Sequence, residues 1–388
     1  MLAPPVGLAA AQVSLRCPVC GSADQETILE RARLPVFQNV VYATEAEARA
    51  APSAPFRLST CRHCGFSWNS LFDENLVRYD ESYNNDVVSG VFVAYYRELA
   101  ARLIARFGLT SGVVYDVGCG SGGFLRELCA LAPGITGVGI DPACQPLEEG
   151  NFKLIRGVFT PELFAGEVKL VLLRHVLEHI PDPVGFATGL AAAIPAGAPL
   201  FVEVPDLDWI YRARAFWDFC YEHCNYFTAA SLKAALTGGG LAVGEQAYAF
   251  GGQYQWALCA REAGAAAAFE GGEAAVAAGQ DYARAEAAAL GRLNQRAAQH
   301  GGLVLWGMAT KGVVLSNMIT PGSLRGGVDM NPAKQGRFAA GSGLPIHAPD
   351  WLKGSEAGLA ILVMNPNYTD EIRAKAAAMG LKQTVLDA

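Results

Sequence analysis

The residues "SGVVYDVGCGSGGFLRELC" (111–129) carry the clearest structural signal in this chain. The apolar run Val113–Val117 predicts a buried strand, the glycines in 118–122 predict a tight turn, and Phe124–Leu131 predicts the start of a helix. Glycine lets a ligand approach the backbone closely at the carboxyl end of a strand. The stretch therefore predicts a nucleotide-binding turn, although an ordinary strand-to-helix loop fits these residues alone.

Two acidic residues indicate which nucleotide the turn serves. "GCGSGG" partly fits the dinucleotide pattern G-x-G-x-x-G, but Asp116 directly precedes the turn. The resulting D-x-G-x-G-x-G form resembles the first motif of class I S-adenosylmethionine-dependent methyltransferases. The next predicted strand, "ITGVGIDP", ends in Asp141, and a carboxylate at that place can accept both hydrogen bonds of a ribose diol.

Further segments repeat the alternation of strand and helix. "FKLIRGVF", "VKLVLLRHVLEHIPDP" and "PLFVEVPD" each contain a predicted strand, and "LEHIPDP" is typical of the same superfamily. The alternation predicts a parallel, doubly wound α/β sheet with its ligand at the carboxyl edge. Gly157 and Val158 are expected at the adenine. The full set of expected cofactor-binding residues is Asp116, Gly118, Cys119, Gly120, Asp141, Pro142, Gly157, Val158, Arg174 and His175.

Four cysteines fall in two tight pairs, "CPVCG" and "CRHCGF". The N-terminal residues lack the basic region and long apolar core of a signal peptide, so the pairs indicate metal binding and not disulfides. Two such knuckles form a tetrahedral zinc site, which is structural because four thiolates leave no position for water. Four buried free cysteines are the alternative, and His63 is expected to be an exposed neighbour. The predicted ligands are Cys17, Cys20, Cys61 and Cys64.

The last third of the chain predicts a second, smaller nucleotide-type fold. Residues 263–300 are rich in alanine and predict one long helix or a helical hairpin. "GLVLWGMATKG", "GVDMNPAKQGRF" and "LAILVMNPNY" then predict a Rossmann-like domain. Lys311 suits an anionic group at a helix start, or is a solvated helix-cap lysine. Lys311, Gly312 and Asn331 are the expected substrate-binding residues.

The predicted division is a zinc-binding lobe (1–75), a methyltransferase core (76–262), a helical linker (263–300) and a C-terminal Rossmann-like domain (301–388). With 388 residues, 52% of them hydrophobic and 17% charged, the chain can bury sizeable cores. A net charge of −7 without a dense basic run argues against nucleic-acid binding. The chain contains no run of about 18 apolar residues, so no membrane span is expected. We expect a cytoplasmic monomer or homodimer.

The combination of motifs is more specific than any part of it. The double CxxC, the methyltransferase core, "YEH" (221–223), "LWGMATKG" and "DMNPAKQGRF" together resemble the zinc-containing sugar C-methyltransferases, over roughly residues 15–385. That family acts on nucleotide-linked 4-keto deoxysugars and makes branched sugars such as tetronitrose and mycarose. The resemblance implies methylation of a carbon next to the ketone, with S-adenosylmethionine as methyl donor and thymidine diphosphate as the expected carrier.

The resemblance also implies catalytic roles. His223 would remove the proton next to the ketone, with Glu222 and Tyr221 beside it. A positioned imidazole accelerates such a step by about 100- to 10,000-fold. His179 matches a second family histidine near the sugar, although "EHIPDP" is often structural in other methyltransferases. A family tyrosine falls on Tyr79 or Tyr83, and tyrosine hydroxyls or the second histidine would donate to the enolate oxygen.

Three other functions compete with this interpretation. An O- or N-methyltransferase would need a base but no enolate. A non-enzymatic scaffold is disfavoured by the intact "DVGCGSGG" together with Asp141 and His223. A dehydrogenase is disfavoured because "GMATKG" lacks the dinucleotide pattern.

Overall fold

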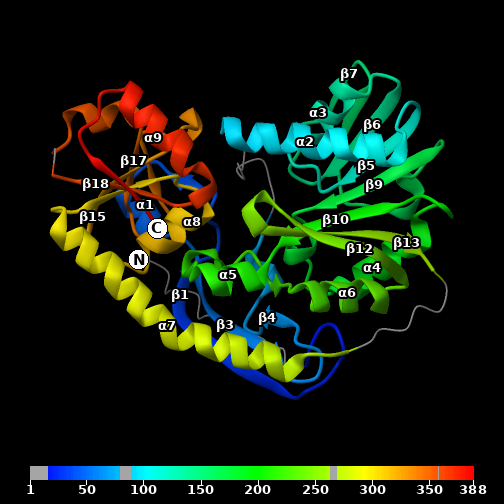
Figure 1. The fold of residues 1–388 in the computed structure, drawn as a ribbon, viewed down its shortest axis with the longest axis horizontal. Coiled ribbons are helices and arrows are strands. Elements are labelled where there is room, and N and C mark those ends of the chain that lie inside the picture. Colours follow the sequence, from blue (N-terminus) through cyan, green and yellow to red (C-terminus); the bar gives the residue numbers. More distant parts are fainter. Residues whose placement is uncertain (1–15, 79–88, 263–268, 357) are drawn as a thin grey trace, which may run out of the picture.

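The computed structural model of the chain describes residues 16–78, 89–262, 269–356 and 358–388. These residues form three sheets (Figure 1). The central and C-terminal sheets lie at opposite ends of an elongated molecule, and the N-terminal lobe lies against both.

The central sheet has eight strands in the order β12-β13-β10-β9-β5-β6-β8-β7. Its middle five strands are parallel, as the alternating pattern predicts. They are β5 (Gly112–Val117), β6 (Ile135–Asp141), β8 (Phe152–Arg156), β9 (Val168–Arg174) and β10 (Leu200–Pro205). The antiparallel strands at the two sides are β7 (Leu147–Glu149), β12 (Leu241–Ala249) and β13 (Tyr254–Arg261).

Helices cover both faces of this sheet (Figure 1). α2 (Gly90–Phe107) and α3 (Gly123–Leu131) share one apolar core with the strands. α4 (Pro183–Ala193) and α6 (Ala229–Gly238) share another on the opposite face. A short helix, α5 (Leu207–Ala213), follows β10. Since both faces are covered, the carboxyl edge of the parallel strands is where a ligand can approach.

Backbone geometry explains the glycines after β5. Gly118, Gly120 and Gly122 have φ values of 76°, 54° and 79°, in the left-handed region that favours glycine. A Cβ on Gly118 would lie 2.2 Å from Cγ2 of Val176. The predicted turn is confirmed, and at Gly118 a larger residue is excluded by both conformation and space.

The N-terminal lobe is a four-stranded antiparallel sheet in the order β1-β3-β4-β11. Its strands are β1 (Gln25–Pro35), β3 (Ser53–Cys61), β4 (Ser67–Asn69) and β11 (Asn225–Tyr226). A helix, α1 (Glu45–Arg49), lies between β1 and β3 in sequence. β11 belongs to the predicted core by sequence, yet it pairs with β4. A boundary at residue 75 therefore separates strands that share one sheet.

The C-terminal sheet has the order β19-β18-β14-β15-β17-β16-β2. Five strands are parallel: β14 (Leu303–Trp306), β15 (Leu324–Val328), β17 (Pro345–His347), β18 (Ala360–Val363) and β19 (Thr384–Asp387). β16 (Arg337–Ala339) and β2 (Val41–Tyr42) are antiparallel. The short helices of this domain are α8 (Thr310–Ser316) and α9 (Thr369–Ala378). The predicted Rossmann-like pattern is present, with one strand supplied by the N-terminal lobe.

A single helix, α7 (Gly272–Gln299), runs along the molecule between the N-terminal lobe and the C-terminal sheet (Figure 1). A Cβ on Gly272 would lie 1.8 Å from the carbonyl oxygen of Arg62, so the helix starts in close contact with the second cysteine knuckle. At the other end, Arg296 Nη1 donates to the carbonyl oxygen of Asp387 at 2.8 Å. Of the two predicted forms, the long helix is confirmed.

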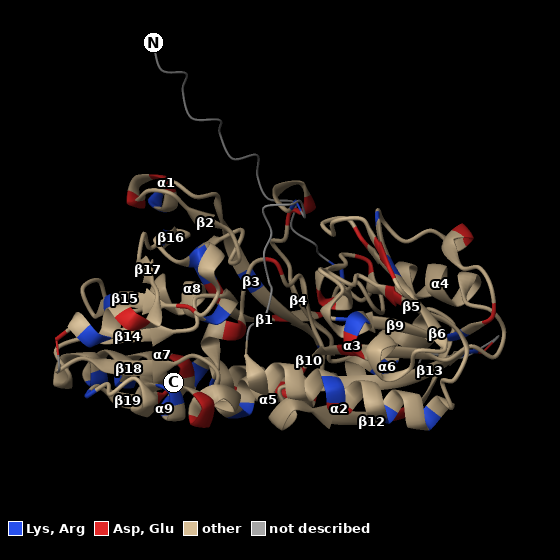
Figure 2. Cartoon of the chain, turned by 90° about the horizontal axis from the view of Figure 1, so that it is seen from above, with Lys and Arg blue, Asp and Glu red and all other residues tan. Residues whose placement is uncertain are grey.

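Basic and acidic residues are interspersed over the described elements (Figure 2). Among the described residues, no helix is both long enough and apolar enough to cross a membrane.

Candidate functional site

Asp141 joins the glycine turn to the end of β6. Its Oδ2 accepts from the Gly120 N–H at 2.9 Å, and its Oδ1 accepts from the Ala143 N–H at 2.7 Å. Each carboxylate oxygen has a further lone pair. The turn and the acid therefore form one preorganised unit, and the acid can still accept from a ligand diol.

Asp116 lies at the end of β5, below the turn, and is only 3% exposed. Burial raises its pKa to about 6, and the Arg174 guanidinium offsets this only in part. Its Oδ1 has no hydrogen-bond partner among the described residues. An unpartnered buried acceptor beside a glycine turn suits a ligand with a hydrogen-bond donor such as an ammonium group, and the predicted contact of Asp116 with the cofactor stays a prediction.

Arg174 is buried at the end of β9. Its Nη2 lies 2.8 Å from Glu203 Oε1, and its guanidinium lies 4.1 Å from the ring centroid of Phe124. Tyr95 of α2 also hydrogen-bonds to Glu203. Arg174 is thus held by partners within the chain, and its contact with the cofactor stays a prediction.

His175 adopts a left-handed backbone with φ 56°. Its Nε2 lies 3.0 Å from Glu203 Oε1 and its Nδ1 lies 3.6 Å from Glu178 Oε1. Burial lowers its pKa, but the two carboxylates outweigh burial and raise the pKa to about 9. A cationic histidine in a strained conformation at a sheet edge is typical of a functional site.

The remaining predicted cofactor residues surround Asp141. The Gly157 N–H donates to the Asp141 carbonyl oxygen at 3.1 Å, and Val158 is 70% exposed beside it. Pro142 is exposed and Cys119 is half-buried. All ten predicted residues therefore lie at or just after the carboxyl ends of β5, β6, β8 and β9.

A histidine pair lies beyond β9 and β10. His179 ends the short turn η3 (Leu177–His179), and His223 lies between η4 (Phe216–Asp218) and β11. Their ring centroids are 4.8 Å apart with an interplanar angle of 86°. His179 Nδ1 lies 3.0 Å from the Glu222 carbonyl oxygen. A carbonyl only accepts, so this nitrogen carries the hydrogen, which fixes the tautomer of His179.

Side chains after His223 fix the pair in place. Asn225 Nδ2 donates to the carbonyl oxygens of Leu177 and Ile180 at 3.1 and 2.6 Å. Cys224 Sγ donates to the Glu178 carbonyl oxygen at 3.4 Å. Cys220 and Cys224 are both buried and pack around the histidine segment.

Burial sets opposite protonation states for neighbouring groups. Desolvation, with a smaller contribution from His179, lowers the pKa of His223 to about 3. Desolvation raises the pKa of Glu222 to about 8, although the Gln38 N–H donates to its Oε2 at 3.3 Å. At neutral pH, His223 is thus an uncharged base and Glu222 a protonated acid.

The tyrosine hydroxyls near this histidine pair form hydrogen bonds to the backbone. Tyr221 is fully buried, and its hydroxyl accepts from the Asp73 N–H at 2.9 Å. The Tyr226 hydroxyl donates to the Cys220 carbonyl oxygen at 2.9 Å. Both hydroxyls are thus bonded to the backbone in this structure, and the predicted role of Tyr221 beside the base stays a prediction. Tyr79 and Tyr83 lie outside the described residues.

On the C-terminal side, Lys311 forms an ion pair with Asp218, and the two side chains are 14% and 16% exposed. It is therefore not a solvated cap, and its charge is already compensated within the chain. A Cβ on Gly312 would lie 2.2 Å from the Gly307 carbonyl oxygen, so close packing accounts for this glycine. Asn331 Oδ1 accepts from the Ala333 N–H at 3.0 Å. As substrate-binding residues, these three stay predictions.

Sequence reasoning missed several buried polar residues nearby. Lys334 is buried, with its Nζ 3.3 Å from both Asn39 Oδ1 and the Met308 carbonyl oxygen. Asn39 is 295 residues away in the chain, so no local pattern predicts this contact. Glu178 and Glu203 were also missed, although a glutamate inside the apolar strand "LFVEV" is a detectable signal.

The four predicted cysteine ligands come together. Cys17 Sγ lies 3.5 Å from Cys64 Sγ, Cys20 Sγ lies 3.5 Å from Cys61 Sγ, and all four sulfurs lie within 4.8 Å of one another. Zn–S bonds of about 2.3 Å in a tetrahedron require sulfurs about 3.8 Å apart. The cluster thus fits a zinc ion. His63 is exposed, as predicted.

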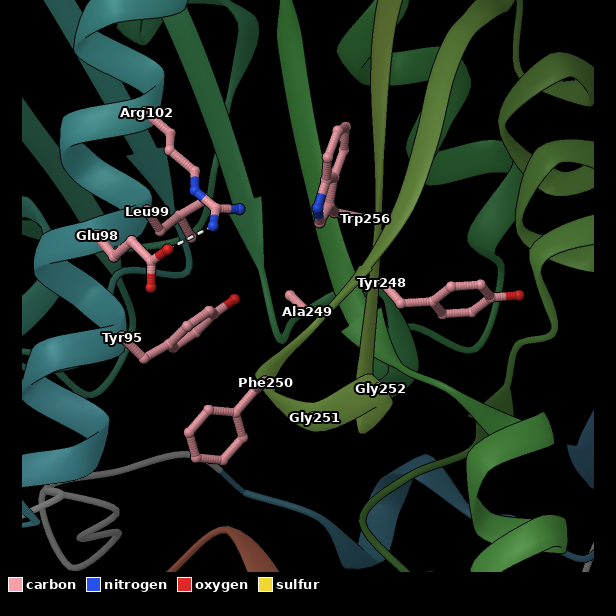
Figure 3. A pocket seen from close by; sticks show the side chains of 10 residues that line it. All are labelled: Tyr95, Glu98, Leu99, Arg102, Tyr248, Ala249, Phe250, Gly251, Gly252 and Trp256. Carbon is pink, nitrogen blue, oxygen red and sulfur yellow. Dashed lines mark hydrogen bonds and ion pairs between the residues drawn. The ribbon is translucent and has the colours of Figure 1, made fainter.

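A cleft of about 220 Å³ opens between α2 and the β12–β13 hairpin (Figure 3). Tyr95, Phe250 and Trp256 line it, and the Glu98–Arg102 ion pair lies at its side. Tyr95 also hydrogen-bonds to Glu203, so the cleft lies next to the Arg174–Glu203 pair.

Comparison with known protein families gives two matches. Residues 92–246 match a methyltransferase domain, and residues 273–385 match the C-methyltransferase C-terminal domain. The curated relative "C-methyltransferase NovU" of Streptomyces niveus is 28% identical over 240 residues, which is 58% of this chain and 56% of that protein. The chain thus spans about half the length of this relative.

Solved methyltransferase structures align over less than half of the chain. CalO1, a methyltransferase in calicheamicin biosynthesis in its SAH-bound form, is 24% identical over 42% of this chain and 54% of its own, with a TM-score of 0.35. Human N-acetylserotonin methyltransferase in complex with SAM is 16% identical over 48% of this chain and 62% of its own, also at 0.35. The fold assignment rests on the strand orders above and not on these partial alignments.

The glycine turn, its acidic partners and the two matches lead to one conclusion: the chain contains a methyltransferase domain followed by a C-methyltransferase C-terminal domain.

Proposed function

We propose that the chain transfers a methyl group from S-adenosylmethionine to the carbon next to the ketone of a nucleotide-linked 4-keto deoxysugar, with thymidine diphosphate as the carrier. The observation that carries this proposal is the half-buried pair His179–His223, whose ring centroids are 4.8 Å apart and whose His179 ring is held by the Glu222 carbonyl oxygen. The matched C-methyltransferase C-terminal domain supports carbon as the methyl acceptor.

The cofactor would be held at the carboxyl edge of the central sheet. Asp141 would accept from the ribose diol, Asp116 from the ammonium group, and the glycine turn would allow close backbone approach. The adenine would lie near Gly157 and Val158. S-adenosylmethionine supplies the activated methyl group as a sulfonium, so the protein's task is to create and orient a carbon nucleophile.

His223 would create that nucleophile. One imidazole nitrogen takes the proton from the carbon next to the ketone, and the C–H electron pair forms the enolate. The enolate carbon then bonds to the methyl carbon while the C–S electron pair stays on sulfur, and the ketone forms again. The proton remains on His223 until it is released after transfer.

Glu222 would stabilise the enolate oxygen. A carboxyl with a pKa of about 8 is mostly protonated at neutral pH, so it can donate a strong hydrogen bond to a developing oxyanion. His179 uses its Nδ1 hydrogen on the Glu222 carbonyl oxygen and so orients the Glu222–His223 segment. The four-cysteine cluster would hold a structural zinc ion that takes no part in the reaction.

Solvent exchange tests the base directly. The enzyme is incubated in D₂O with a thymidine-diphosphate-linked 4-keto deoxysugar, and mass spectrometry follows deuterium at the carbon next to the ketone. The His223→Asn variant should lose exchange and methyl transfer by at least about 100-fold, with unchanged S-adenosylmethionine binding by calorimetry. The matched control His347→Asn, in β17 of the C-terminal sheet, should keep both.

Wild-type exchange in His223→Asn would refute the base assignment. NMR of the product then separates the alternatives, because O- or N-methylation leaves every carbon-bound hydrogen of the sugar in place.

A further inference from the structure

Glu178 is 2% exposed and lies between His175 on one side and the His179–His223 pair on the other. Its Oε1 is 3.6 Å from Nδ1 of His175. Its Oε2 has no hydrogen-bond partner among the described residues. Atoms of its carboxylate and of the His179 and His223 imidazoles lie within 4.8 Å of one another. One buried carboxylate is thus shared between the cofactor edge and the histidine pair.

We propose that Glu178 is a positioning residue for the base: its buried carboxylate stabilises the imidazolium that His223 becomes when it takes the substrate proton. This role rests on the function proposed above. It goes beyond that function because it assigns a task to a group that contacts neither the cofactor nor the carbon that is methylated.

Surrounding charges keep Glu178 ionised in spite of its burial. Desolvation alone raises the pKa of Glu178, but the contact with the cationic His175 opposes it, and the pKa is lowered. His175 and Arg174 carry two positive charges, and Glu178 and Glu203 carry two negative charges. A buried carboxylate is tolerated when it is compensated in this way.

The Glu178 carboxylate matters at the step in which His223 takes up the substrate proton and becomes positively charged. In the resting state His223 is neutral, and proton uptake would place a cation in a poorly solvated site. Glu222 cannot compensate that cation, because it is itself protonated at neutral pH. His179, His175 and Lys311 oppose the new charge, although the charges of His175 and Lys311 are themselves paired with carboxylates. Glu178 is therefore the anion facing His223, and Coulomb attraction at this range is strong away from water.

The local backbone gives this carboxylate a fixed place. Asn225 holds the carbonyl oxygens on both sides of Glu178, and Cys224 Sγ donates to the carbonyl oxygen of Glu178 itself. A site whose supporting groups are locked in this way keeps its geometry during reaction. The arrangement corresponds to a base oriented and stabilised by a third group, with no proton moving onto the carboxylate.

The test compares three variants of the full chain in the exchange and methyl-transfer assays. Glu178→Gln keeps the shape and removes the charge, so kcat should fall by about 100-fold with the sugar KM and S-adenosylmethionine affinity within about 3-fold of wild type. Glu178→Asp keeps the charge and should lose less than about 10-fold. Glu286→Gln, which removes a carboxylate paired with Arg31 outside this site, is the matched control and should keep wild-type kcat.

The double variant His223→Asn/Glu178→Gln separates this role from general packing. If Glu178 acts only through His223, the double variant should be no slower than His223→Asn alone.

Wild-type kcat in Glu178→Gln, an equal loss in Glu178→Asp, or fully additive losses in the double variant would each overturn the role of Glu178 and leave the base assignment standing. Wild-type exchange in His223→Asn would instead overturn the proposed function, and the role of Glu178 with it.

Discussion

The central and C-terminal sheets contain the same turn, built from different residues. In the central sheet, the Gly120 N–H donates to Asp141, 21 residues later. In the C-terminal sheet, the Met308 N–H donates to Asp329, also 21 residues later and at 2.8 Å. Each acid also accepts from the N–H two residues beyond it, at 2.7 and 2.8 Å.

The two turns differ in whether the strand before the turn carries a buried acidic residue at its end. Asp116 ends β5 with an unpartnered buried oxygen, whereas the strand before the second turn ends in Leu305 and Trp306. The cation after the second turn, Lys311, is neutralised by Asp218. The same hydrogen-bonding pattern can therefore close a turn for packing, and we expect the buried acid at the strand end to adapt the first turn to a cationic ligand.

Replacing a glycine in each turn should give the largest difference in cofactor affinity between the two turns. Gly118→Ala should weaken S-adenosylmethionine binding by at least about 100-fold, since a Cβ there lies 2.2 Å from Val176 and φ is 76°. Gly307→Ala is the matched change, with φ 106° and no contact closer than 3.9 Å. It should lower the melting temperature but leave cofactor affinity within about 3-fold. Calorimetry on both variants measures this, and equal cofactor losses would mean that both turns serve the cofactor.

A smaller difference is expected between the two acids. Asp141→Asn should weaken S-adenosylmethionine binding by about 10- to 100-fold, because a buried ligand hydroxyl would lose a charged acceptor. Asp329→Asn should leave that affinity unchanged and lower only the melting temperature. The same titrations, combined with thermal unfolding, test this. An undiminished affinity in Asp141→Asn would remove Asp141 from the cofactor site.

The smallest expected effect is a pH dependence of cofactor affinity, which we expect from Asp116 at the turn of the central sheet. Burial raises the pKa of Asp116 to about 6, so below that pH its carboxylate gains a proton and can no longer pair with an ammonium group. Cofactor affinity should therefore fall as the pH falls through about 6, by up to about 10-fold per pH unit. Asp116→Asn should bind weakly at every pH and lose this dependence. A variant that keeps the wild-type pH profile would assign the titration to another group.

Short sequence patterns predicted those features of the structure that depend on residues close together in the chain. The turn of residues 118–122 follows from its glycines, the parallel strands follow from their apolar runs, and the four-cysteine cluster follows from cysteine spacing. The sequence also placed His223 and Glu222 in the candidate site. It could not predict that Gln38 reaches Glu222 or that Asn39 reaches Lys334, because these contacts join segments 184 and 295 residues apart.

Two-residue strands escaped prediction for a related reason. β2 and β11 are too short to show an alternating pattern, and each joins a sheet formed mainly by another part of the chain. The sequence shows that Tyr221 is aromatic, but it could not predict that the Tyr221 hydroxyl bonds to the backbone of Leu71 and Asp73.

The borrowed strand β2 has a consequence for biosynthesis. Tyr42 leaves the ribosome early, but its partner Phe338 is translated only about 300 residues later. Until then, this edge of the N-terminal lobe has nothing to pair with and is exposed to other nascent chains. The lobe therefore completes its hydrogen bonding only after residue 338 has been translated, so the N-terminal lobe and the C-terminal sheet are completed together.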